Sequence, residues 1–173
     1  EDGGKKTENP GMVLIQPGTF KMGSDGGLPS ERPVHQVKVD EFWIDKCEVT
    51  NYQYLQVVAQ PPFLRKSTFP RKYHDGNYLK NWKDDLMPEL RSELKPVTNV
   101  SWYAARHYCS FVGKRLASEA EWEMAARAGG EDKYSFDGGV EFLPDYGWFR
   151  ENSGGMIHTT AQKLSNPNGL FDI

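Results

Sequence analysis

The stretch that decides the fold runs from Pro96 to Arg127 and reads PVTNVSWYAARHYCSFVGKRLASEAEWEMAAR. It predicts two helices joined by a tight turn. The hydroxyl of Ser101 can cap the first helix, because it can accept hydrogen bonds from amides of the first turn. Apolar residues then recur at helical spacing and predict one buried face made of Trp102, Ala105, Cys109 and Val112.

Gly113 is predicted to end the first helix, because glycine adopts the left-handed C-terminal conformation at little cost. Ser118 and Glu121 have the spacing of a reciprocal capping box and therefore begin a second helix. Its apolar stripe consists of Trp122, Ala125 and Ala126. Trp122 is expected to be buried beside Trp102.

The run NVSWYAARHYCSFVGKRLASEAEWEMAARAG closely resembles the most characteristic segment of the formylglycine-generating enzyme family, the sulfatase-modifying-factor domain. Three further matches occur in the same order as in the family: GMVLIQPGTFKMGS at 11–24, ERPVHQVKVDEFWIDKCEVTNYQY at 31–54 and NSGGMIHTTAQKLSNPNGLFDI at 152–173. The resemblance covers nearly the whole chain from Gly11.

This resemblance implies an α+β fold that is rich in loops and related to the C-type lectins. In the oxidising members of the family, the segment similar to GLFDI continues into a half that carries the paired catalytic cysteines. The resemblance therefore implies that the domain at 11–173 is incomplete at its C-terminus. It assigns no catalytic, cofactor-binding or metal-binding residue to this chain.

The composition fits one folded domain preceded by a loose arm. The 173 residues are 38% hydrophobic and 13% aromatic, which suffices for a core, and 17 Gly with 11 Pro predict many turns. Residues 1–10 are polar and lack periodicity, so we expect a flexible arm there. A start at Glu1 is what removal of a signal peptide would leave, which favours a periplasmic or extracellular protein.

Charge and hydropathy exclude two kinds of partner. The formal net charge of −3 gives no general attraction to nucleic acid. No apolar run approaches the roughly 20 residues that a membrane-spanning helix needs. A protein partner or a larger complex is expected instead.

The N-terminal third predicts short strands and one helix. Met12 to Ile15 and Thr19 to Met22 are expected to form a hairpin around Gln16-Pro17-Gly18, and residues 34–39 alternate at strand period. Phe42, Trp43 and Ile44 extend this apolar surface. A helix follows, with Thr50 and Gln53 as a capping box and an inward face made of Tyr54, Val57 and Val58, before Pro61-Pro62 ends it.

Residues 63–95 predict a long ordered loop, with eight basic and five acidic residues among several aromatics. Loops of this length are often functional, so the segment is a candidate contact surface. Its aromatic and basic residues could also stack on nucleobases, namely Arg71, Lys72, Tyr73, Tyr78, Lys80 and Trp82. The loop interpretation is favoured because the acidic residues dilute the charge and the family carries a similar stretch there.

The cysteines and histidines carry little sign of catalysis. Cys47 and Cys109 lie in unrelated contexts without metal-ligand spacing, and packing as small buried thiols is the favoured interpretation. The resemblance places Cys109 where some members have a structural cysteine bonded to one in the later half. His35, His74, His107 and His158 show no spacing typical of a mononuclear iron site.

Three other groups of residues are candidate sites. Glu119, Glu121 and Glu123 are better explained by helix capping and solvation than by acid–base chemistry. The tryptophans Trp43, Trp102, Trp122 and Trp148 could form a sugar-stacking platform, but core packing is favoured. The resemblance implies calcium as a family ligand, and Asn152 with Asp145 lie in the relevant region, although no ligand set is assigned.

Two functions remain open. The first is an exported, non-catalytic interaction domain or accessory subunit that binds a protein or a glycan. The alternative is an oxidase that uses copper and oxygen to convert a protein cysteine to formylglycine, with its catalytic cysteines beyond residue 173. The first is favoured for the chain as given.

Overall fold

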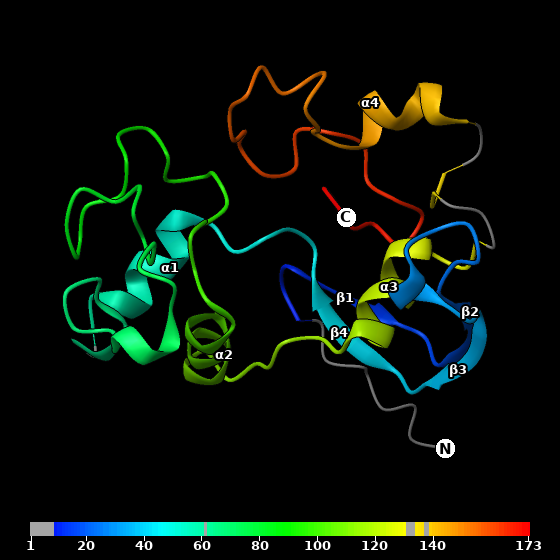
Figure 1. Ribbon diagram of the computed structural model, residues 1–173, viewed down its shortest axis with the longest axis horizontal. Helices are drawn as coiled ribbons and strands as arrows, with labels where there is room; N and C mark the ends of the chain where they lie inside the picture. Colours follow the sequence, from blue (N-terminus) through cyan, green and yellow to red (C-terminus); the bar gives the residue numbers. More distant parts are fainter. Residues whose placement is uncertain (1–8, 61, 131–133, 137–138) are drawn as a thin grey trace.

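A computed structural model describes residues 9–60, 62–130, 134–136 and 139–173, and these form two lobes side by side (Figure 1). The α-lobe holds α1 (Asn51–Val58), α2 (Trp102–Phe111) and the segment 59–101 between them. The β-lobe holds β1 (Met12–Ile15), β2 (Gly18–Met22), β3 (His35–Val39), β4 (Phe42–Asp45), α3 (Glu119–Arg127) and α4 (Leu143–Tyr146). This mixture of helices and small antiparallel sheets confirms the α+β class. Most of the predicted arm at 1–10 lies outside the described residues.

The four strands form one long antiparallel ribbon. β1 pairs with β4 and β2 pairs with β3, so the predicted hairpin between β1 and β2 is wrong. The β1–β4 and β2–β3 pairings follow the same register. If that register continued between them, Pro17 would lie opposite Asp40. Because proline has no N–H to donate, the ladder is interrupted there and resumes on the other side. Gln16-Pro17-Gly18 is therefore a bend within one arm of the ribbon, and the chain reverses between β2 and β3.

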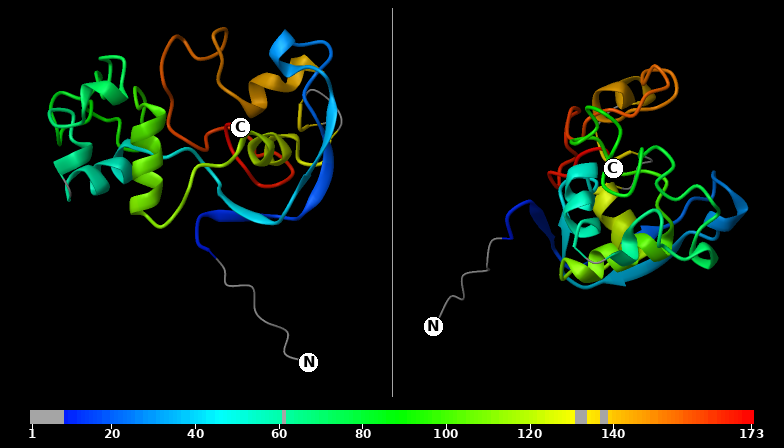
Figure 2. Two further views of the ribbon diagram at one scale, coloured as in Figure 1. Left: turned by 60° about the horizontal axis from the view of Figure 1, so that its bottom comes forward. Right: turned by 90° about the vertical axis from the view of Figure 1, so that its left-hand side faces the viewer.

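Helix α3 packs on this ribbon and forms the core of the β-lobe. Figure 2 shows the helix lying across the strands. The approach is close at Gly18, where an added Cβ would stand 2.9 Å from Cε of Met124 and the flexible end of that side chain would have to move. The buried core of this lobe consists of Ile15, Val39, Phe42, Ala125 and Leu170.

Glu123 joins α3 to the turn between β2 and β3. Its Oε1 accepts hydrogen bonds from the amide of Gly23 at 2.9 Å and from Nε of Arg127 at 2.8 Å. Arg127 in turn donates to the carbonyl of Gly23. Glu123 therefore ties α3 to this turn, a role that the local sequence could not show because Gly23 lies 100 residues away.

Local capping signals fix the three longer helices. The side chain of Thr50 accepts from the Gln53 amide in a complete capping box, and Ser118 with Glu121 forms another at α3. Ser101 caps α2 by accepting from the amide of Ala104. Gly113 follows α2 with a φ of +74°, in the left-handed region predicted for it. The remaining short elements are 3₁₀ turns at Pro29–Glu31, Pro62–Leu64, Arg71–Tyr73 and Val140–Phe142.

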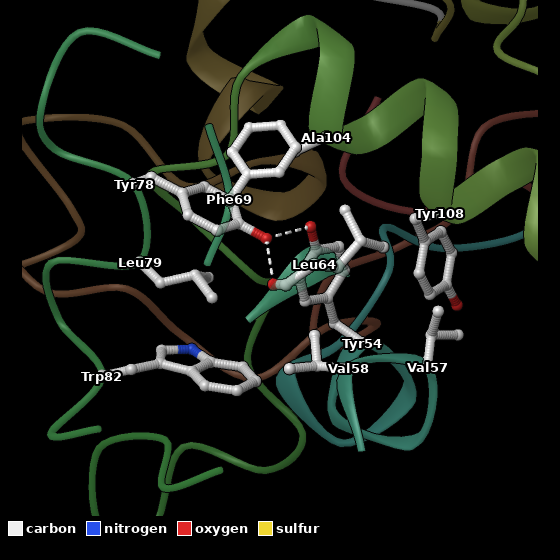
Figure 3. Close-up of a cluster of buried hydrophobic side chains, with 10 residues drawn as sticks. All are labelled: Tyr54, Val57, Val58, Leu64, Phe69, Tyr78, Leu79, Trp82, Ala104 and Tyr108. Carbon is white, nitrogen blue, oxygen red and sulfur yellow. Dashed lines mark hydrogen bonds between the residues drawn. The ribbon is translucent and has the colours of Figure 1, made fainter. Parts of the chain in front are cut away.

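The core of the α-lobe surrounds Tyr54 (Figure 3). Its ring stacks on Tyr108 of α2 at 5.2 Å between centroids and meets the edge of Trp82 at 6.2 Å. The Tyr78 hydroxyl donates to the carbonyl of Leu64 at 2.7 Å, so the Tyr54 hydroxyl donates to the Tyr78 oxygen at 2.9 Å. Burial raises the pKa of Tyr78 to about 12.

The long segment 59–101 supplies half of this core. Tyr78, Leu79 and Trp82 are at most 3% exposed, so the idea that Tyr78 and Trp82 stack on nucleobases is wrong. The inward face predicted for α1 is confirmed, since Tyr54, Val57 and Val58 are all buried.

The predicted inner faces of α2 and α3 need correction. Trp102 is 58% exposed and Trp122 is 52% exposed, so the two tryptophans do not form a buried pair. In α2 the buried residues are Ala104 and Tyr108 instead. The apolar stripe of this helix is wide, and only one side of it meets the rest of the α-lobe.

Candidate functional site

A groove runs between the two lobes along the segments that connect them. Its cavity of about 680 Å³ is walled by β4, by residues 46–49, by the C-terminal end of α2 with the following residues 113–117, and by the C-terminal residues 170–173. We call it the interlobe groove. Its apolar side chains include Trp43, Val112, Trp122, Phe171 and Ile173. These residues leave a substantial apolar surface within one concave site.

Both cysteines line the interlobe groove, although sequence reasoning placed them in unrelated contexts. Cys47 follows β4, and Cys109 lies in the last turns of α2. Both are free thiols of intermediate burial. Nothing in their local sequence indicates this convergence, because it depends on how the two connecting segments pass each other.

The environment of the two cysteines disfavours the thiolate form. Burial raises the pKa of the Cys109 thiol, and the carboxylate of Asp45 raises it further. Burial also raises the pKa of Cys47, with added contributions from Glu48, Asp172 and Asp45. A nucleophilic or metal-binding cysteine needs the opposite, an electropositive setting that favours the thiolate.

Opposite charges are already paired at the mouth of the groove. Nζ of Lys114 lies 2.6 Å from the Asp45 carboxylate and forms an ion pair with it. The charge of the same lysine also acts on the nearby Cys109 thiol and lowers its pKa. Arg115 forms two hydrogen bonds to Glu121, at 2.6 and 2.7 Å. Burial raises the pKa of Glu48, and the charge of Asp172 adds to this effect. The charges of Lys46 and Lys114 lower the pKa of Cys47 and Cys109 respectively, but burial and the neighbouring carboxylates outweigh them.

The histidines are dispersed over the molecule. His107 is exposed and meets Phe63 at 4.9 Å between rings, while His158 stacks on Trp148 at 3.7 Å. His74 contacts Phe69 and Tyr78, and His35 is exposed in β3. Within the described residues, no group of three or more His, Cys, Asp or Glu side chains is arranged to hold a metal ion.

The side chain of Asn152 is occupied in shaping its own loop. Its oxygen accepts from the Phe149 amide at 2.7 Å, and its Nδ2 donates to the Gly147 carbonyl at 2.9 Å. Nearby, the carbonyl of Asp145 accepts from the Leu164 amide. Among the residues it describes, the structure therefore shows no set of calcium ligands around Asn152 and Asp145. Calcium binding stays a prediction from the family resemblance.

Of the four tryptophans in the sugar-platform interpretation, Trp43 and Trp122 line the interlobe groove, whereas Trp102 and Trp148 do not. Trp148 lies between the His158 ring and Nζ of Lys163, which is 4.0 Å from its centroid. Trp43 is partly buried in β4, whereas Trp102 contacts Tyr103 and Arg106 on α2. Across the described residues, no helix is long and apolar enough to cross a membrane.

Comparison with proteins of known sequence places the chain among relatives of several kinds. It is 33% identical over 172 residues to the serine/threonine-protein kinase pkn1 of Chlamydia caviae, covering 94% of this chain and 26% of that protein. It is 32% identical over 202 residues to the inactive C-alpha-formylglycine-generating enzyme 2 of Bos taurus, covering 94% of this chain and 67% of the relative. A formylglycine-generating enzyme of Thermomonospora curvata is 32% identical, and the match covers 78% of this chain and 54% of that enzyme. The chain thus spans about a quarter of the kinase and about two thirds of the inactive enzyme.

Solved structures confirm the fold. PvdO from Pseudomonas aeruginosa superimposes with a TM-score of 0.67 at 23% identity, covering 93% of this chain and 66% of that one. Treponema denticola variable protein 1 does so with a TM-score of 0.69 at 22% identity, covering 92% and 68%. The family model of the sulfatase-modifying factor enzyme 1-like domain matches residues 2–173. The chain therefore belongs to the sulfatase-modifying factor family, to which the formylglycine-generating enzymes are also related.

Proposed function

We propose that this chain acts as a non-catalytic interaction domain, an accessory part of a larger assembly that binds a protein partner. The observation that carries the proposal is the state of its two cysteines. Both line the interlobe groove, yet burial and neighbouring carboxylates raise the pKa of each thiol. Cysteine chemistry at neutral pH needs a thiolate, and these surroundings disfavour it.

The relatives support a domain that is used in more than one way. One of them is named as an inactive member, and another is named as a protein kinase; each matches 94% of this chain. The same domain thus occurs in proteins that are not named for cysteine oxidation. The extracytoplasmic location stays a prediction from the sequence.

The alternative function is oxidation of a protein cysteine to formylglycine. Relatives named as formylglycine-generating enzymes favour it, with 29–32% identity, as does the convergence of both cysteines on one groove. In that case copper and oxygen would supply the oxidising chemistry. The residues of this chain that face the groove would then have to bind the substrate peptide.

A peptide-oxidation assay tests whether the two cysteines of this chain are themselves catalytic. The purified chain is incubated with copper, oxygen and a peptide containing Cys-x-Pro-x-Arg, and the peptide mass is followed. The formylglycine-generating enzyme of Thermomonospora curvata serves as the positive control. Formation of the aldehyde would overturn the interaction domain, whereas an unchanged peptide shows that Cys47 and Cys109 do not carry out the oxidation.

A further inference from the structure

We propose that an exposed face of the α-lobe binds an acidic peptide segment of a partner protein. The face is formed by α2 and residues 62–74, and we call it the aromatic–basic face. This proposal rests on the proposed function and deepens it, because it names both the surface and the chemistry of the partner.

A row of three aromatic rings forms the face, two of them exposed and the third, Tyr73, partly buried against the core. Tyr103 of α2 stands at its centre, with its ring 4.9 Å from Tyr73 and 5.3 Å from Trp102. Trp102 is 58% exposed and Tyr103 is 46% exposed, whereas the core tyrosine Tyr54 is only 1% exposed. Exposed tryptophan and tyrosine in contact with each other are the side chains that most often dominate protein interfaces.

Cations flank both ends of this row. Nζ of Lys72 lies 4.8 Å above the ring of Tyr73, and the guanidinium of Arg106 lies 5.4 Å above that of Trp102. Both cations are exposed and remain available to an additional ligand. The rings hold them in place, which lowers the entropy lost when a carboxylate pairs with them.

The sequence of this face contains no carboxylate. Residues 62–74 and α2 contain no Asp or Glu, and Arg71, Lys72 and Arg106 are exposed there. Arg65 and Lys66 lie beside Asp85, so the positive charge of the face comes mainly from the three exposed cations. A surface of this kind complements acidic side chains and steers them to it.

The rings and the border of the face fit a short peptide better than a nucleic acid strand. Tyr73 and Tyr103 are tilted by 37°, and Trp102 meets Tyr103 edge-on at 85°, so they do not offer parallel platforms to successive bases. Carboxylates lie next to the face. Hydrogen bonds from Asn77 lower the pKa of Asp75, and hydrogen bonds from Ser67 lower that of Asp85, so both stay charged. A long polyphosphate would have to cross them, whereas a short peptide would not.

The expected complex combines two kinds of contact. Carboxylates of the peptide pair with Arg106 and Lys72, where the guanidinium can form two parallel hydrogen bonds. An apolar side chain of the peptide packs on Trp102 and Tyr103 between them. Binding should therefore need both the acidic and the apolar residues of the peptide.

Fluorescence anisotropy with the intact chain tests this. The probe is a labelled peptide of alternating glutamate and phenylalanine, and the same peptide with glutamine in place of glutamate is the control. We expect saturable binding of the acidic peptide that weakens with added salt, and no binding of the control. Trp102→Ala should weaken it about tenfold or more, as for other central interface aromatics.

Two charge variants complete the design. Arg106→Gln should weaken binding, whereas Lys38→Gln, an exposed lysine of β3, should leave it unchanged. Thermal melts of each variant establish that folding is retained, which is expected because Trp102 and Arg106 are exposed.

Three outcomes would overturn the proposal: absence of peptide binding, binding that survives both Trp102→Ala and Arg106→Gln, or tighter binding of an oligo-dT strand than of the peptide. The peptide-oxidation assay remains independent of all three. A failed binding experiment therefore rejects this face without deciding whether the chain is catalytic.

Discussion

The side chain of Asn51 and the indole of Trp82 are joined by a buried hydrogen bond of 2.9 Å, with Trp82 as the donor. Each residue is 1% exposed. Nδ2 of Asn51 also donates to the carbonyls of Ser92 and Lys95, at 3.0 and 3.2 Å. One amide at the start of α1 thus fixes three points of the long segment 59–101.

Removing this amide should destabilise the α-lobe. Asn51→Ala leaves the buried Trp82 indole without its acceptor, which costs about 1–3 kcal/mol, and the carbonyls of Ser92 and Lys95 keep only their backbone donors. We expect a loss of at least about 2 kcal/mol in denaturant melts. Asn77→Ala, an exposed asparagine of the same segment, should change stability by less than about 0.5 kcal/mol. Equal effects of the two variants would contradict the role of Asn51.

Two tryptophans should behave oppositely when truncated. Trp82→Ala opens a cavity in the buried core and should cost about 3–5 kcal/mol. Trp122→Ala removes a side chain that is 52% exposed and should cost under about 1 kcal/mol. Paired urea melts measure both, and a larger loss for Trp122 would show that α3 is covered on that side.

The cap of α3 gives a smaller, local prediction. Ser118→Ala leaves the Glu121 amide without its acceptor and should cost about 1 kcal/mol. Ser110→Ala, at an exposed position inside α2, is the matched control and should be nearly neutral. Thermal melts that shift equally for the two variants would remove Ser118 from the capping role.

Acid should weaken the same helix start. Hydrogen bonds from Arg115, together with those of Ser118, lower the pKa of Glu121 from 4.5 to about 2. Because the pKa is lower in the folded state, the contribution is present above about pH 4.5 and is lost as the pH falls towards 2. The guanidinium of Arg115 is mostly exposed, so the contribution should stay below about 1 kcal/mol.

The variant Glu121→Gln isolates this contribution. Its stability should fall less between pH 5 and pH 2 than that of the natural chain, although Asp75 and Asp85, whose pKa values are also lowered, keep part of the acid dependence. Glu119→Gln, in the same turn but outside the ion pair with Arg115, is the control variant. An unaltered profile for Glu121→Gln would exclude the ion pair as its source.

What the sequence could predict depended on how local the signal was. The capping boxes at Thr50 and Ser118 were predicted because each is complete within four residues. The pairing of β1 with β4 was not predicted, because the paired residues lie more than 25 positions apart and the sequence around Pro17 is typical of a turn. Nor could periodicity tell that Trp102 and Trp122 are exposed, because it shows which residues share a face but not which face is covered.

The candidate site was harder to predict than the fold. Tyr78, Leu79 and Trp82 occur in a segment without periodicity, so their burial arises from tertiary contacts with α1 and α2. Cys47 and Cys109 meet in one groove because two connecting segments pass between the lobes. The family resemblance correctly predicted membership and fold, and the raised pKa values of the thiols came only from the structure.

The most direct test of the account follows the mass of a Cys-x-Pro-x-Arg peptide incubated with this chain, copper and oxygen. The account predicts that the peptide keeps its thiol, and that the natural chain, Cys47→Ser and Cys109→Ser give the same result. Conversion of the cysteine to an aldehyde by the natural chain, abolished in either serine variant, would contradict it and make the interlobe groove an active site.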